Sequence, residues 1–448
     1  MINPNICARI LTLKKRTLIK GGRRLTRGGS RPGAGRTHID GKEIKLKVPD
    51  KVMEQLDLFF PGKTMQERIR DCLEFGISQM NSNHRNLIDE SCQPNVIDLF
   101  SGAGGLSRGF QDAGFNVRLG IDFDDAALKT FKENHGDADV MKLDLFNHDN
   151  LKYVLDYLDK NKIKVDVLVG GPPCQGYSLA GPRNEHDKRN TLYEAMVKLA
   201  GLVKPKAVVL ENVPGLVRLF DGKAAKRIVK DFTELGYNMQ YKQLYAPEYG
   251  VPQIRKRVFF VGVLKNFGEF EYPKPMLSPD EFITCKDAIG DLPSLEHDLG
   301  TEEADYTMPA MTEYQKVMRK NSKKLMNHVG TQHSPKTVKL ISMVPEGKNY
   351  KSLPSPYNTM FKYHEALTRY DSHKPSLTIN TGHRSHFHYK WNRIPTVRES
   401  ARLQTFPDDF IFYGNKSQQY RQVGNAVPPL LGKAVATQIM KLFKEQKH

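Results

Sequence analysis

The spacing of hydrophobic positions changes along the chain, and each change marks a different kind of segment. From Asn95 to about Gly262, short apolar runs rich in β-branched residues alternate with stretches long enough for helices. Four of these runs are typical of buried strands: 96–100, 165–169, 207–210 and 258–263. Alternation of this kind predicts an α/β fold with a doubly wound, mostly parallel sheet and helices on both faces.

A different pattern covers residues 42–83. Apolar residues between 44 and 48 alternate with Lys45 and Lys47, which predicts a short strand. Two helical stretches follow, and Thr64 with Glu67 forms a capping box for the second. This β-α-α order resembles a ribbon-helix-helix module, a family in which two chains pair their strands and lay the ribbon in the major groove of DNA.

That resemblance implies a homodimer through this module, with Lys45 and Lys47 directed at DNA. A small capping or dimerisation domain without DNA contact explains the same pattern, and the residues leave both interpretations open.

The remaining segments have weaker patterns. Residues 1–41 are rich in Arg, Lys and Gly and predict a flexible basic arm, and residues 81–94 predict a linker. Residues 273–392 lose the strand–helix alternation and predict a separate, irregular domain. Helical periodicity returns in 393–448, which we expect to rejoin the catalytic core, assigned to 95–272.

The charge of the chain is concentrated at its N-terminus. The formal net charge is +18, and residues 1–47 carry 13 Lys and Arg against two acids. Such a concentration favours binding to a polyanion, most often nucleic acid, although a solvated tail that aids solubility has the same composition.

Cysteine usage and hydropathy indicate the compartment. The five cysteines are scattered without a C-x-x-C pair, so neither a disulfide framework nor a zinc site is expected, and free thiols fit the reducing cytoplasm. Without a secretory leader or a run of roughly 18 apolar residues, we expect no membrane association.

Candidate ligand-binding residues follow three predicted strands. The first strand leads into Phe100, Gly102 and Gly104, and glycines there let backbone N–H groups approach a ligand, although a plain tight turn needs them too. Asp122 follows about 20 residues later, at a position where an acid commonly binds the hydroxyl groups of a ribose. Asp144 lies at the end of a third predicted strand. Together they predict a nucleotide-like cofactor site.

Two further strand ends carry candidate catalytic groups. Cys174 lies after two prolines and opens a polar loop, as a nucleophile would, whereas a structural thiol normally lies within an apolar run. Glu211 ends the next strand, where it would protonate a ring nitrogen or merely cap a helix.

Six motifs in this order resemble the DNA cytosine-5 methyltransferase family over residues 95–448, apart from a variable region near 295–372. They are the segments Phe100–Gly105, Gly171–Ser178, Glu211–Val213, Gln253–Arg257, Arg398–Pro407 and Gln422–Pro429. The resemblance implies a Rossmann-like methyltransferase core, a target-recognition domain and S-adenosyl-L-methionine as the methyl donor.

The family match also implies the role of each catalytic residue. Cys174 is the thiolate that attacks C6 of cytosine, Glu211 binds the amino group and N3, Arg257 contacts O2, and Arg255 supports the loop or the electrostatics of the substrate. Because the base must leave the stacked duplex, the loop after Cys174 is expected to close over DNA. Its DNA contacts are Gln175, Ser178, Arg183 and Arg189.

For the cofactor, the resemblance assigns the methionine end to Phe100, Gly102, Gly104 and Asn425. Asp122, often Glu in the family, binds the ribose. Phe123 stacks on adenine, Asp144 accepts from its amino group and Leu192 covers its other face.

The family further implies a double-stranded DNA substrate, recognised through residues within 295–372, and a bacterial or phage restriction-modification setting with a cognate endonuclease as partner. Two alternatives stay open: an RNA cytosine-5 methyltransferase, and a DNA-binding repressor whose catalytic domain is inactive or secondary. The N-terminal module also suggests an added regulatory role, the repression of its own or a companion gene. The three histidines of Gly382–His388 are expected to make structural or phosphate contacts rather than bind a metal.

Overall fold

The computed structural model describes residues 93–173, 192–218, 220–359, 367–382 and 385–446. The predictions for the basic arm and for the β-α-α module, including Lys45 and Lys47, lie outside these residues. From Gln93 to the C-terminus the chain clusters into one compact unit. Among the described helices, none combines the length and the apolar character that a bilayer crossing requires.

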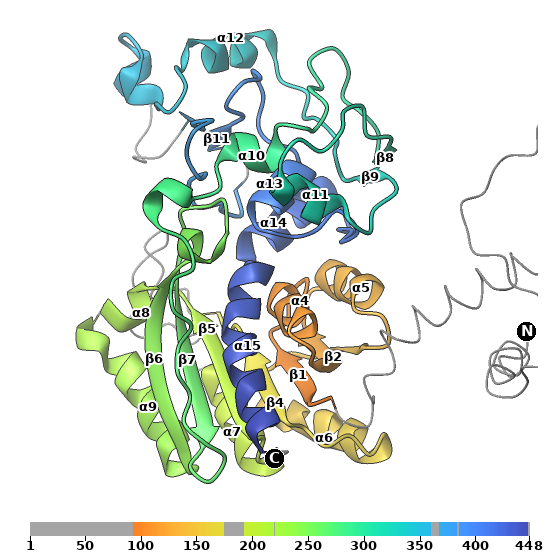
Figure 1. Cartoon of the computed structure of the whole chain (residues 1–448), viewed down its shortest axis with the longest axis vertical. Helices are drawn as coiled ribbons and strands as arrows, with labels where there is room; N and C mark the ends of the chain where they lie inside the picture. Colours follow the sequence, from red (N-terminus) through yellow and green to blue (C-terminus); the bar gives the residue numbers. More distant parts are fainter. Residues whose placement is uncertain (1–92, 174–191, 219, 360–366, 383–384, 447–448) are drawn as a thin grey trace, which may run out of the picture. The chain divides into compact units, whose positions relative to one another are not determined.

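A seven-stranded sheet in the order β3-β2-β1-β4-β5-β7-β6 forms the centre of this unit (Figure 1). Strands β1 to β5 are parallel, and β7 runs antiparallel to both β5 and β6. The bounds are β1 Asn95–Leu99, β2 Asn116–Asp122, β3 Asp139–Lys142, β4 Val167–Gly170, β5 Ala207–Asn212, β6 Tyr237–Tyr245 and β7 Lys256–Leu264. The predicted α/β class is therefore confirmed.

Helices cover both faces of the sheet, because both faces are apolar. On one face α4 (Gly105–Asp112), α5 (Asp125–Asn134) and the C-terminal α15 (Pro429–Glu445) share a core with the sheet. On the other face lie α6 (Leu151–Lys160), α7 (Tyr193–Val203) and α9 (Lys223–Glu234), with the short α8 (Gly215–Arg218) between strands β5 and β6.

The last helix, α15, packs directly on α4 although more than 300 residues separate them along the chain (Figure 1). Gly109 makes this approach possible, since a Cβ there would lie 2.5 Å from the backbone nitrogen of Lys433. The end of the chain thus completes the hydrophobic core of its first βα unit.

Between β7 and α13 (Val397–Leu403) the described part of the chain forms only short elements. They are α10 Cys285–Ile289, α11 Glu313–Arg319, α12 Pro335–Met343, the 3-10 helices Pro279–Glu281, Tyr350–Ser352 and Tyr357–Thr359, and the two-residue strands β8 Glu303–Ala304, β9 Leu325–Met326, β10 Thr368–Arg369 and β11 His386–Phe387. One hydrophobic cluster joins α10 and α11 to α13 and to α14 (Lys416–Asn425). The proposed domain boundaries stay a prediction.

Buried arginines stabilise this region in place of long regular elements. Arg402 donates to Asp408 through two nitrogens, both at 2.7 Å, and to Asp291 at 2.8 Å. Arg369 donates to several backbone carbonyls, including that of Ile341. The buried His388 accepts from the backbone N–H of Lys390 and Trp391, a structural use of this histidine.

Candidate active site

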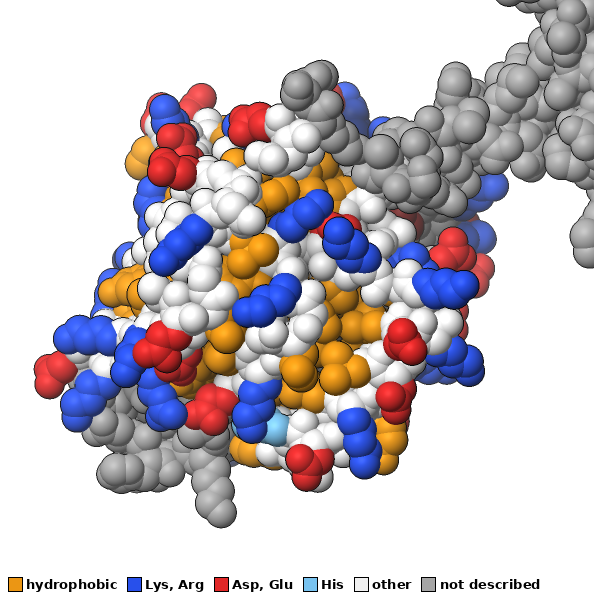
Figure 2. Space-filling view, turned by 90° about the horizontal axis from the view of Figure 1, so that it is seen from below, with side chains coloured by type: hydrophobic (Ala, Val, Ile, Leu, Met, Phe, Trp, Pro, Cys, Tyr) orange, Lys and Arg blue, Asp and Glu red, His pale blue; other side chains and the backbone are white. Residues whose placement is uncertain are grey.

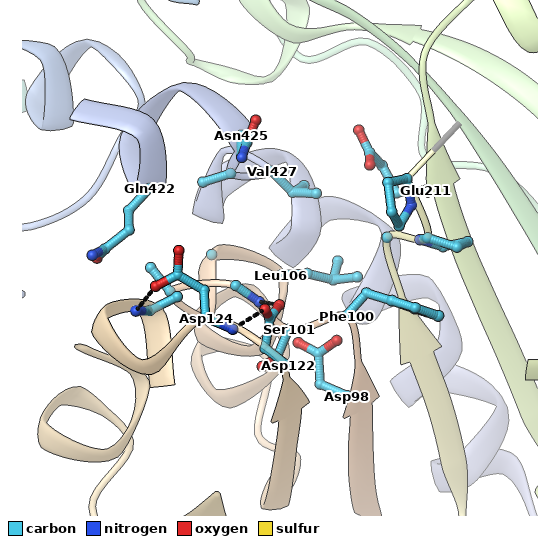
Figure 3. Close-up of a pocket in the computed structure, with 18 of the residues that line it drawn as sticks. Asp98, Phe100, Ser101, Leu106, Asp122, Asp124, Glu211, Gln422, Asn425 and Val427 are labelled. Carbon is cyan, nitrogen blue, oxygen red and sulfur yellow. Dashed lines mark hydrogen bonds between the residues drawn. The ribbon is translucent and has the colours of Figure 1, made fainter. Parts of the chain in front are cut away.

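A cavity of about 690 Å³ opens at the carboxyl ends of the parallel strands. Its walls come from the loops after β1 to β5 and from the C-terminal end of α14, so residues more than 300 positions apart face one space (Figure 3). Among the predicted site residues, the cavity is lined by Phe100, Gly102, Asp122, Phe123, Asp144, Leu192, Glu211, Arg257 and Asn425. This is the edge of an α/β sheet at which ligands are expected.

The loop between β1 and α4 forms one wall through a strained backbone. Phe100 has a φ of 59°, an unusual value for a residue with a side chain, and Gly102 and Gly104 have φ of 54° and 92°. Gly104 does not line the cavity. It lies behind the wall, where an added Cβ would be 2.0 Å from His135 Nε2, so only glycine fits there.

Asp122 fixes this loop to the next strand end. Its carboxylate accepts the N–H of Gly102 at 2.8 Å, that of Phe123 at 2.7 Å and that of Asp124 at 3.0 Å. Burial raises the pKa of Asp122, while these three N–H groups lower it. Beside it the Phe123 ring is 69% exposed, although a large apolar side chain is usually covered.

Asp98 is a cavity residue that the sequence analysis did not single out. It lies in β1, is almost fully buried and accepts the Ser107 hydroxyl at 2.6 Å. Its pKa is raised to about 7, mainly by burial and to a smaller extent by the charge of Asp122, while the hydrogen bond from Ser107 acts against this rise. The sequence does contain a sign of this residue, because an acid interrupts the otherwise apolar run of β1. A buried acid normally needs a hydrogen-bond or ionic partner.

Glu211 and Arg257 form an ion pair at the other end of the cavity, with Arg257 Nε 2.8 Å from Glu211 Oε1. Antiparallel pairing of β5 with β7 brings the two residues together. Burial raises the pKa of Glu211, and the charges of Arg257 and Arg255 act against this rise. The carboxyl group is therefore easier to protonate than an exposed glutamic acid.

Asn212 connects this pair to the segment that leads to position 174. Its side-chain amide donates to the Pro172 carbonyl at 3.0 Å, in a buried hydrogen bond. A Cβ built on Gly171 would lie 3.5 Å from Glu211 Oε2. Gly171 and Pro172 are therefore held close to the Glu211 carboxylate.

Arg255 occupies a different place from Arg257, outside the cavity wall. Its guanidinium donates to the carbonyls of Ile379 at 3.1 Å, Gly424 at 2.9 Å and Ala426 at 3.0 Å. Gly424 and Ala426 themselves line the cavity. Arg255 thus stabilises the cavity wall without lining it, because it joins its own segment to the segments around Ile379 and Gly424–Ala426.

Two oxygens at the cavity have unused hydrogen-bonding capacity. Ser101 Oγ and Gln422 Oε1 are buried and, among the described residues, have no partner. Buried polar atoms are normally paired, so a ligand with polar groups fits this space. Four acids (Asp98, Asp122, Asp124 and Asp144) line the same region and favour a ligand that carries positive charge.

Residues 94–441 match the family of C-5 cytosine-specific DNA methylases. The chain belongs to this family. Type II methyltransferase M1.HphI of Haemophilus parahaemolyticus is 39% identical over 351 residues, which cover 77% of this chain and 86% of that protein. Type II methyltransferase M.DdeI of Desulfomicrobium norvegicum is 34% identical over 377 residues, covering 78% and 89%.

A solved structure agrees with this assignment. A crystal structure described as that of a DNA modification methyltransferase encoded within an E. coli prophage has 26% sequence identity and a TM-score of 0.64, covering 79% of this chain and all of that one. The enzyme is therefore a DNA cytosine-5-methyltransferase, and the predicted family is confirmed.

Part of the methyltransferase's predicted site lies outside the described residues. These are the predicted nucleophile Cys174 and the expected DNA contacts Gln175, Ser178, Arg183, Arg189, Lys45 and Lys47. Their roles stay predictions, as do the roles of the residues that line the cavity.

Replacing Arg255 with lysine is expected to lower the free energy of unfolding of this methyltransferase by about 2–4 kcal/mol, because one ammonium cannot reach the carbonyls that the guanidinium spans. Urea unfolding measures the loss. Arg218→Lys is the matched control, since Arg218 is exposed and, among the described residues, donates only to Gln243 at 3.1 Å. Equal stability of the two variants would contradict the supporting role.

Proposed function

We propose that this methyltransferase transfers a methyl group from S-adenosyl-L-methionine to C5 of a cytosine in a specific double-stranded DNA sequence. The observation that carries the proposal is that one cavity contains both the Glu211–Arg257 pair and the glycine loop with its acids. A base held by the pair and a cofactor held by the loop would therefore share one cavity.

The residues around the loop fit this cofactor. Asp122 would bind the ribose hydroxyls, the exposed Phe123 ring would stack on adenine, and Asp144 would accept from its amino group. Leu192 would cover the opposite face of the adenine. Phe100, Gly102 and Asn425 would hold the methionine end, with Gly104 behind them. When bound, S-adenosyl-L-methionine supplies an electrophilic methyl group from its positively charged sulfonium, which the acidic wall favours.

Cytosine C5 is a poor nucleophile, and the protein residues would activate it. The thiolate of Cys174 would form a bond to C6 while Glu211 places a proton on N3, and the electron pair of the C5–C6 bond becomes available at C5. Arg257 would contact O2, where negative charge develops. After methylation, a base removes the C5 proton, the C6–sulfur bond breaks, and N3 returns its proton.

This chemistry requires the target base to leave the duplex, at a cost of a few kcal/mol. The loop from Gln175 to Asn190 would close over the DNA, with Gln175, Ser178, Arg183 and Arg189 in contact with it. Residues within 295–372 would read the sequence.

The biological setting is proposed from the relatives. Both relatives described above are named Type II methyltransferases, which supports a modification enzyme of a restriction-modification system, with a cognate endonuclease as partner. The N-terminal module, including Lys45 and Lys47, would dimerise and bind an operator. If promoter binding is unchanged after deletion of residues 1–85, this regulatory role is wrong.

Bisulfite sequencing of a plasmid from cells that express the protein tests the proposed reaction. Protected cytosines within one recurring sequence are the expected result. Methyl incorporation into tRNA with unmodified DNA would show instead that the substrate is RNA.

A further inference from the structure

The side chain of Phe146 is exposed inside the cavity. Phe146 follows β3 and is 49% exposed, and Phe123 is the other strongly exposed aromatic ring of the cavity wall. Leaving an aromatic ring partly in water forgoes some of the free energy that its burial would contribute. Two such rings in one cavity indicate a ligand that covers them.

The two rings come from neighbouring strand ends. Strands β2 and β3 are parallel and pair Asp122 with Lys142, so Phe123 and the loop after Lys142 start from adjacent positions. The Asp144 carboxylate belongs to the same loop. Aromatic rings and a hydrogen-bond acceptor at one end of a cavity are suited to a purine that carries an amino group.

The loop that carries Phe146 is held by its own side chains. Asp144 Oδ1 accepts the backbone N–H of Phe146 at 2.9 Å, and the Asn150 amide donates to the Asp144 carbonyl at 2.8 Å. Asn147 caps the short 3-10 helix His148–Asn150. The backbone at Phe146 is therefore fixed before a ligand arrives.

The rings of Phe123 and Phe146 are both free of aromatic contacts with the described residues. Within the part of the chain that the structure describes, neither Phe123 nor Phe146 stacks on another ring. Both are thus available to a planar group.

We propose that Phe146 is a second aromatic contact for the adenine of the cofactor, in addition to Phe123. The inference rests on the proposed use of S-adenosyl-L-methionine. The adenine then lies against rings from two strand ends while its amino group reaches Asp144. Phe146 binds the cofactor itself, so its contribution does not depend on DNA.

Calorimetric titration of the full-length protein with S-adenosylhomocysteine, without DNA, tests the proposal. Phe146→Ala is expected to weaken binding about 5- to 20-fold, as loss of one base-stacking ring does. Phe146→Tyr, which keeps the ring, should bind within about twofold of wild type. The matched control is Tyr153→Ala, because Tyr153 is 48% exposed but does not line the cavity, and its affinity should be unchanged.

A second ligand locates the contact on the cofactor. Methylthioadenosine keeps the adenine and lacks the amino-acid part, so Phe146→Ala should weaken its binding by the same factor. Unchanged affinity for S-adenosylhomocysteine would overturn the proposal, and so would a loss confined to that ligand. If wild type binds neither ligand, the proposed cofactor is wrong, a result distinct from failure of Phe146 alone.

Discussion

Replacing Cys174 with alanine is expected to abolish methyl transfer, with a loss of at least about 10⁴-fold, as removal of other catalytic nucleophiles has shown. Without a thiolate at C6, C5 stays too weak a nucleophile to accept the methyl group. Specific DNA binding should remain, because alanine removes only the sulfur. Methyl incorporation and a DNA mobility shift measure the two effects on the same preparation.

Cys285→Ala is the matched control. Cys285 is buried in the hydrophobic cluster of α10, and burial raises the pKa of its thiol, so it is poorly suited to be a nucleophile. We expect this variant to retain methyl transfer.

A trapping experiment tests the covalent step separately. Release of the enzyme requires removal of the hydrogen at C5 as a proton, and a fluorine atom at C5 cannot be removed in this way. DNA that contains 5-fluorocytosine should therefore stay bonded to the wild-type enzyme on a denaturing gel. An adduct with Cys174→Ala, or turnover by that variant, would rule out Cys174 as the nucleophile.

The candidate cofactor site could be predicted largely from strand ends. Asp122 ends β2 and Asp144 lies two residues after the end of β3, and parallel strands bring their carboxyl ends to one edge of a sheet. The prediction therefore needed only the strand pattern and the acids. Phe146 was not identified because an aromatic residue four positions after a strand gives no sign of whether it is buried.

The different positions of the two arginines in the Gln253–Arg257 segment could not be predicted from the sequence. Both were assigned to catalysis, but only Arg257 reaches the cavity, through its pairing with Glu211. Arg255 donates to carbonyls up to 171 residues away, and no local pattern reveals such contacts.

Strand β6 was not predicted for a related reason. Among the described strands it pairs only with β7, at the edge of the sheet, and its polar residues (Asn238, Gln240 and Lys242) interrupt the apolar run expected of a buried strand. The apolar residues Tyr237, Met239 and Tyr241 alternate with these polar ones, which is the pattern of a half-exposed strand, and a search for continuous apolar runs does not find it.

Replacing Glu211 with glutamine is expected to slow methyl transfer by about 10²- to 10³-fold while changing the affinity for S-adenosylhomocysteine little. Glutamine keeps the shape of the side chain but cannot place a proton on N3, where negative charge develops during attack at C6. Single-turnover rates and calorimetric titration separate the two effects. Glu234→Gln, on the exposed side of α9, is the control and should react at the wild-type rate.

The pH dependence gives a second test. Burial raises the pKa of Glu211, which increases its protonated fraction near neutral pH, although Arg257 at 2.8 Å opposes this effect. Because the protonated acid is the reactive form, the wild-type rate should fall as pH rises above this pKa. Glu211→Gln has no proton to lose and should not show that decrease. A wild-type rate in Glu211→Gln would assign the N3 proton to another group, and an unchanged pH profile would mean that the decrease arises elsewhere.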